Sequence, residues 1–155
     1  MQNYDGGIGQ GPGLESHGGS TFCAVATLAI LDRLDEGWIN REELILWLLD
    51  RHFMGFQGRV GKPEDTCYTF WIGAPLAILG GCHFVNQDRL FSFICANQDH
   101  QGGLGRDQES HCDPNHTYLS LAGLSLFMDI PGLKKVNPKF AMADSSSSFF
   151  HKFFQ

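Results

Sequence analysis

The sequence predicts an all-α protein in which helix-pair repeats form two concentric layers of helices. Three segments align at a constant offset of 48 residues, as the positions of Gly7, Gly55 and Gly103 show. Each segment has a glycine-rich loop followed by a long apolar stretch, and the first two continue into an amphipathic stretch. A repeat of about 48 residues is typical of a helix pair that buries its apolar face against neighbouring repeats.

The apolar stretches predict the first helix of each repeat, over residues 20–34, 65–79 and 113–128. They are apolar on nearly every face, so we expect them in the inner layer, buried on both sides. The amphipathic stretches predict outer helices over residues 40–52 and 86–98. Three repeats cannot close a ring, so we expect an open arc that is part of a larger barrel.

Three local signals mark the helices. Pro75 should kink the middle inner helix, because it lacks an N–H group and its ring crowds the preceding turn. Asn40 followed by Glu43 resembles a capping box. Asp113 followed by Pro114 is typical of an N-cap with proline at the first helical position.

The repeats define a domain over residues 1–143. Residues 144–155 contain four serines and four phenylalanines and lie outside the repeat. We expect this segment to be a flexible tail.

Composition and charge exclude several classes of protein. The chain has 155 residues, enough for one domain, and 43% of them are hydrophobic, enough for a sizeable core. Its net charge of −6 argues against binding nucleic acid through bulk charge. The most membrane-like stretch, residues 70–79, is half of the roughly 20 residues that a transmembrane helix needs.

The N-terminal sequence and the cysteines indicate the compartment. The N-terminus has neither the basic nor the apolar region of a signal peptide. The five cysteines are odd in number and form no close CxxC pair, which favours free thiols or metal ligation over a disulfide framework. We expect a cytoplasmic protein.

The start of the inner helices carries a candidate metal site. Asp65 and Cys67 begin the second inner helix, and His116 lies in the first turn of the third. A carboxylate, a thiolate and an imidazole with a fourth position open suit a catalytic zinc ion. The alternative is a helix cap, a small core residue and a packed histidine.

Basic and aromatic residues gather at the same end of the inner helices. His17, Arg59 and Lys62 would face several helix N-termini there, an arrangement that favours a phosphate or diphosphate; alternatively, the two cations are solvated. An apolar cavity on the axis of the ring would be lined by Phe22, Cys23, Tyr68, Phe70, Trp71 and Tyr118. These residues are alternatively ordinary core, which we favour for Phe22 and Phe70.

Longer motifs in these segments resemble the β subunit of protein prenyltransferases. The motifs are His-Gly-Gly-Ser-Thr-Phe-Cys from His17, Gly-Arg-x-x-Lys-Pro-x-Asp-Thr-Cys-Tyr-Thr-Phe-Trp from Gly58, and His-x-Tyr-x-x-x-x-Gly-Leu-Ser-Leu from His116. The resemblance covers about residues 3–138. Ser20 and the run Asp-Thr-Cys-Tyr from Asp65 are most similar to the type I geranylgeranyltransferase.

The resemblance implies a partial α/α toroid, the C-terminal half of a β subunit that pairs with a helical α subunit. One zinc ion per chain would be bound by Asp65, Cys67 and His116, whereas Mg²⁺ is not implied. Geranylgeranyl diphosphate would be bound by His17, Gly19, Arg59, Lys62, Tyr68 and Trp71. The implied catalytic residues are Asp65, Cys67, His116 and Tyr68.

The implied reaction transfers geranylgeranyl to the cysteine thiol of C-terminal CaaX motifs, in proteins such as small GTPases. One alternative is a truncated, non-catalytic chain that acts only as an α-subunit-binding module. Another is a farnesyl- or Rab-type β chain. Because family members are about twice as long, we expect this chain alone to be inactive. We expect no nucleic-acid partner. We also expect no transmembrane segment.

Overall fold

The computed structural model describes residues 2–153. Its elements, in chain order, are α1 (Gly18–Ile30), α2 (Arg41–Leu49), α3 (Tyr68–Trp71), α4 (Gly73–Leu79), the short 3₁₀ helix η1 (Cys82–Phe84), α5 (Gln87–Ala96), α6 (Pro114–Phe127), β1 (Val136–Asn137), β2 (Met142–Ala143) and α7 (Asp144–Phe153). The predicted all-α class is confirmed, with one short hairpin added.

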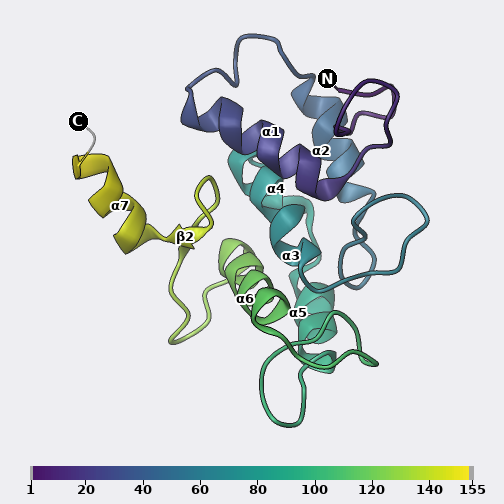
Figure 1. The fold of residues 1–155 in the computed structure, drawn as a ribbon, viewed down its shortest axis with the longest axis vertical. Coiled ribbons are helices and arrows are strands. Elements are labelled where there is room, and N and C mark those ends of the chain that lie inside the picture. The colour runs from purple at the N-terminus through teal and green to yellow at the C-terminus, as the bar shows by residue number, and fades with distance from the viewer. Residues whose placement is uncertain (1, 154–155) are drawn as a thin grey trace.

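The helices form the two predicted layers. The inner layer consists of α1, then α3 with α4, then α6, which pack against one another in that order (Figure 1). In the outer layer α2 packs against α4 and α5 packs against α6, so each outer helix covers the inner helix of the next repeat. The arrangement is open, with α1 at one edge. Cys23, Thr27 and Ile30 of α1 are exposed, so the expectation that inner helices are buried on both sides is wrong for this helix.

The middle inner helix is interrupted close to Pro75, where the sequence predicts a kink. The helix is interrupted at Ile72, which separates α3 from α4. Pro75 lies three residues further on and has no N–H group to donate to the carbonyl of Trp71. The helix therefore lacks one backbone hydrogen bond next to the interruption.

The outer helices begin where their caps predict. The side chain of Asn40 accepts a hydrogen bond from the N–H of Glu43 at 3.3 Å, and Asn86 accepts one from the N–H of Arg89 at 3.0 Å. The capping box expected at Asn40 is only half formed. The backbone N–H of Asn40 donates to Oε1 of Gln2 at 2.6 Å. Gln2 therefore accepts the hydrogen bond that a capping box would assign to the side chain of Glu43.

A hairpin follows α6 in place of a further outer helix. Its strands β1 and β2 pair antiparallel, with Val136 opposite Ala143. The ammonium group of Lys135 donates to the carbonyl oxygen of Ser125 at 3.0 Å, which ties the hairpin to α6. The segment expected to be a flexible tail begins with α7, whose side chains at Ser147 and Ser148 hydrogen-bond to the carbonyl of Asp144. That this segment moves, and that a domain boundary lies after residue 143, stay predictions.

Two further expectations concern membranes and thiols. Within residues 2–153, the helices are too short or too polar to cross a bilayer. All five cysteines are free thiols, as their number and spacing predict.

The inner helices α3 and α6 approach closely because of Gly123. A Cβ atom at this position would lie 2.4 Å from the carbonyl carbon of Thr69, closer than atoms can pack. The same interface buries Phe70, Leu119 and Ala122. Glycine at residue 123 therefore sets the distance between the helices that carry the predicted metal ligands.

Replacing Gly123 with alanine should lower the free energy of unfolding by about 1–3 kcal/mol, because the new methyl group overpacks the interface between α3 and α6. Urea denaturation measures the change. Gly11→Ala is the control, since the only heavy atom close to its added Cβ would be Cδ1 of Leu14 at 3.7 Å. Equal stability of the two variants would show that α3 and α6 can separate without cost.

Candidate active site

At or just before the start of each inner helix, one side chain accepts a hydrogen bond from the backbone N–H two residues further on. At α3 this side chain is Asp65, which precedes the N-cap Cys67, so the helix expected from residue 65 begins at Tyr68. His17, Asp65 and Asp113 stand 48 residues apart. Nδ1 of His17 accepts from the N–H of Gly19 at 3.0 Å, Oδ1 of Asp65 from Cys67 at 2.9 Å, and Oδ1 of Asp113 from Asn115 at 2.8 Å. Because the inner helices pack side by side, these caps and the first-turn residues meet at one end of the layer.

The structure brings the three predicted metal ligands together. One ligand atom each of Asp65, Cys67 and His116, here called the metal cluster, lies within 4.8 Å of the other two. Nε2 of His116 lies 3.4 Å from Oδ1 of Asp65, and both side chains are 18% exposed. A carboxylate, a thiol and an imidazole at these distances fit the donor set of a tetrahedral zinc ion with one open position.

The surroundings of Cys67 keep its thiol protonated. Burial raises the pKa of the Cys67 thiol well above its ordinary value, and the neighbouring Asp65 carboxylate raises it further. Because a thiolate here would be both buried and next to a negative charge, it needs a cation beside it. A divalent metal ion would supply that charge and displace the proton.

A polar cleft of about 340 Å³ adjoins the metal cluster. The charged and polar side chains that line this anion cleft are His17, Arg59, Lys62, Tyr68 and Arg106, together with the carboxylates of Glu64, Asp65 and Asp107. Arg59 forms an ion pair with Glu15, and Glu64 accepts from the backbone N–H of Met54. The arrangement combines positive side chains with the start of an inner helix, which suits an anion such as a diphosphate.

His17 and Tyr68 form a directed hydrogen-bond chain in the cleft. Burial, and then the nearby Arg59 guanidinium, lower the pKa of His17, which favours the neutral imidazole. Its Nδ1 accepts from Gly19, so its single hydrogen is on Nε2, which lies 2.9 Å from the hydroxyl oxygen of Tyr68. Burial raises the pKa of Tyr68 to about 12, so this hydroxyl keeps its hydrogen. The Tyr68 O–H is therefore free to donate to a bound anion.

Sequence reasoning missed Arg106. Its side chain lines the anion cleft from the loop before α6, and it is paired with Asp107 at 2.9 Å. The repeat contained a signal, because residue 106 is 48 positions after Gly58, next to Arg59. Gly58 itself is required, since a Cβ atom there would lie 2.1 Å from the ring of Tyr68.

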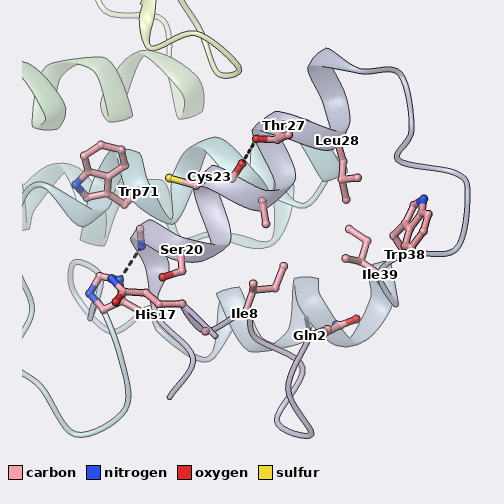
Figure 2. A pocket seen from close by; sticks show the side chains of 14 residues that line it. Gln2, Ile8, His17, Ser20, Cys23, Thr27, Leu28, Trp38, Ile39 and Trp71 are labelled. Carbon is pink, nitrogen blue, oxygen red and sulfur yellow. Dashed lines mark hydrogen bonds between the residues drawn. The ribbon is translucent and has the colours of Figure 1, made fainter. Parts of the chain in front are cut away.

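A mostly apolar groove of about 790 Å³ runs along α1 from the anion cleft. Figure 2 shows Ser20, Cys23 and Thr27 along α1, with Trp71 near His17 and Trp38 at the far end. Gly19 also lines the groove. His17 lines both the cleft and the groove, so the two spaces adjoin at this residue.

The other aromatic candidates lie outside the groove. Phe22 and Phe70 contact each other with ring centroids 5.2 Å apart and pack in the core, as their sequence positions favoured. The hydroxyl of Tyr118 donates to the carbonyl of Ala141, so Tyr118 binds the hairpin rather than lining the groove. Of the six residues considered for the cavity, Cys23 and Trp71 line it, and Tyr68 lines the adjoining cleft.

Comparison with known proteins decides the family. Residues 1–142 match the prenyltransferase α/α-toroid domain. The chain belongs to this family. The Candida albicans protein geranylgeranyltransferase-I, solved in complex with GGPP, superimposes with a TM-score of 0.89 at 30% identity and covers 99% of the chain. The prenyltransferase toroid predicted from the motifs is therefore confirmed.

Curated prenyltransferase relatives extend beyond the matched region. The chain is 40% identical to the geranylgeranyl transferase type-1 subunit beta of Dictyostelium discoideum over 88% of its length, and 36% identical to the Arabidopsis thaliana counterpart over 91%. It is 37% identical to the type-2 subunit beta of Saccharomyces cerevisiae over 97%. The chain spans 39%, 40% and 47% of these three proteins, and 48% of the Candida chain.

The pKa of His17 offers a direct test of the cleft. We expect its imidazole to titrate below 6.5 in the folded chain, and Arg59→Ala to raise the midpoint, because a repelling positive charge is removed while Glu15 remains. NMR titration of the His17 ring measures both values. Stability should fall as the pH drops below 6.5, since the unfolded histidine then binds more protons than the folded one. A midpoint unaffected by Arg59→Ala would contradict the charge arrangement.

Proposed function

We propose that the chain is the catalytic β-subunit portion of a zinc-dependent protein geranylgeranyltransferase of type I. The observation that carries this proposal is that the metal cluster, the anion cleft and the apolar groove adjoin one another. Asp65 belongs to both the metal cluster and the anion cleft, and His17 belongs to both the cleft and the apolar groove. A thiol, a diphosphate and a hydrocarbon chain would thus meet at one place. The names of the type-1 relatives and of the GGPP-bound structure support the choice of isoprenoid.

In this proposal Asp65, Cys67 and His116 hold one zinc ion per chain, with a fourth position open to the substrate. Bound zinc supplies a Lewis acid that lowers the pKa of the acceptor cysteine thiol. No separate site for Mg²⁺ is proposed.

The anion cleft would bind the diphosphate and stabilise its departure. The acceptor sulfur forms a bond to C1 of the isoprenoid, the C1–O bond breaks, and the diphosphate leaves with the bonding electron pair. Arg59, Lys62 and the free O–H of Tyr68 face the space where this negative charge accumulates. Preorganised donors of this kind stabilise a transition state more than the ground state.

The groove along α1 and Trp71 would hold the hydrocarbon chain. The proposed partners are a prenyltransferase α subunit and proteins that end in a CaaX motif, such as small GTPases, with leucine or phenylalanine at the last position. Five free thiols are typical of a reducing compartment such as the cytoplasm.

Purified chain should contain one zinc ion, and Cys67→Ala should reduce the zinc content sharply, because it removes the sulfur ligand. Metal analysis after exhaustive dialysis measures this. Cys95→Ala is the matched control, since Cys95 is an exposed cysteine on α5. Full zinc occupancy in the Cys67 variant would disprove the metal site.

We expect negligible prenyl transfer from the 155 residues alone, even with zinc and an α subunit, since the groove is open along α1. Near-attack placement can be worth about 7–11 kcal/mol and needs a lipid pocket closed on all sides. Completing the toroid with the N-terminal half of a type-1 relative should allow geranylgeranylation of a peptide ending in Cys-a-a-Leu. A radiolabelled-isoprenoid assay compares the two proteins.

In the completed toroid, Arg59→Ala should lower kcat/KM by about 10- to 100-fold, the loss of one charge-assisted hydrogen bond. Arg89→Ala, an exposed arginine on α5, is the matched control. Comparable turnover by the short and the completed proteins, or equal rates for the two arginine variants, would contradict these expectations.

A further inference from the structure

Asp113 makes a second contact besides capping α6. Its Oδ1 accepts hydrogen bonds from the backbone N–H groups of Asn115 and His116, at 2.8 and 3.0 Å. Its Oδ2 lies 2.5 Å from Nδ1 of the His116 imidazole. An ionised carboxylate can only accept hydrogen bonds, so Nδ1 of His116 carries the hydrogen in this contact.

The position of that hydrogen decides what the other nitrogen can do. A neutral imidazole carries one N–H, so Nε2 of His116 keeps an unshared electron pair. Nε2 is the nitrogen that faces Asp65, at 3.4 Å, within the metal cluster. The ring is 18% exposed and its Nδ1 is held by Asp113, so its orientation is set before any cation arrives.

We propose that Asp113 is a positioning residue for the metal cluster, one that places the His116 hydrogen on Nδ1 and thereby presents Nε2 to a divalent cation. This inference rests on the proposed zinc-dependent function. A carboxylate behind a metal-binding histidine fixes the ring and increases its basicity. Asp113 itself stays outside the cluster, because its carboxylate lies on the Nδ1 side of the ring.

His17, the equivalent residue of the first repeat, shows that the hydrogen position depends on the partner. Its Nδ1 accepts from a backbone N–H, so its hydrogen is on Nε2. The two imidazoles therefore carry opposite tautomers within one site. At His116 the carboxylate of Asp113 places the imidazole hydrogen on Nδ1.

The Asp113→Asn variant separates positioning from capping. Its amide oxygen can still accept from the two backbone N–H groups, and asparagine is as good an N-cap as aspartate. Its NH₂ group would then face Nδ1 of His116 and donate to it, which moves the imidazole hydrogen to Nε2. We expect the affinity for Zn²⁺ to fall about 10- to 100-fold, with the melting temperature of the metal-free chain unchanged.

The measurements are Zn²⁺ competition against a chromophoric chelator and the absorption spectrum of the Co²⁺-loaded chain, which reports the ligand set. Asp113→Ser keeps a cap without any group facing Nδ1, so its loss of affinity should be smaller than that of Asp113→Asn. Asn86→Ala removes the cap of α5, away from the site, and should lower the melting temperature while leaving Zn²⁺ affinity unchanged.

Wild-type Zn²⁺ affinity and an unaltered Co²⁺ spectrum in Asp113→Asn would overturn the inference, while the proposed function would stand. Affinity losses that follow melting temperature in all three variants, Asn86→Ala included, would also overturn it, because capping alone would then explain them. A wild-type chain that binds no Zn²⁺ would instead overturn the metal site of the proposed function, and this inference with it.

Discussion

The site depends on one constraint, a backbone hydrogen bond that a polar side chain accepts at the start of each inner helix. A helix leaves its first N–H groups without partners, and in each repeat one polar side chain accepts from an N–H at or next to the helix start. That side chain must lie at the N-terminal end of its helix, and the N-terminal ends of the inner helices lie together. His17, Asp65 and Asp113 therefore reach the same small volume without any loop having to carry them there.

Each of these side chains also makes a second polar contact, and the site is built from those contacts. The second nitrogen of His17 contacts Tyr68, Oδ1 of Asp65 also faces Nε2 of His116, and the second oxygen of Asp113 contacts the far side of the same ring. Opposite tautomers follow at the two histidines. One side of the site consequently presents an O–H donor to anions, while the other presents an electron pair to a cation.

Packing brings the capped ends close enough to act together. Gly123 lets α6 approach α3, and Gly58 leaves room for the ring of Tyr68. The opposite edge of the layer is less complete, because the exposed face of α1 forms one wall of the groove. The chain spans less than half of the length of these relatives.

Much of this protein could be predicted from its sequence because the signals are local or repeated. The 48-residue offset determined the repeat, helix pairing and the shared position of the caps, and Pro75 determined the interruption at Ile72. The motifs determined the family and the candidate ligands. Tertiary structure alone decided that Asp65, Cys67 and His116 lie within 4.8 Å, because this distance depends on how closely neighbouring repeats pack. The same packing brings Arg106 to the cleft, although its offset of 48 residues from Gly58 carried a signal. The tertiary structure also decided which nitrogen of each histidine carries the hydrogen. The tautomer depends on the donor or acceptor that lies opposite each nitrogen, and folding places that group there.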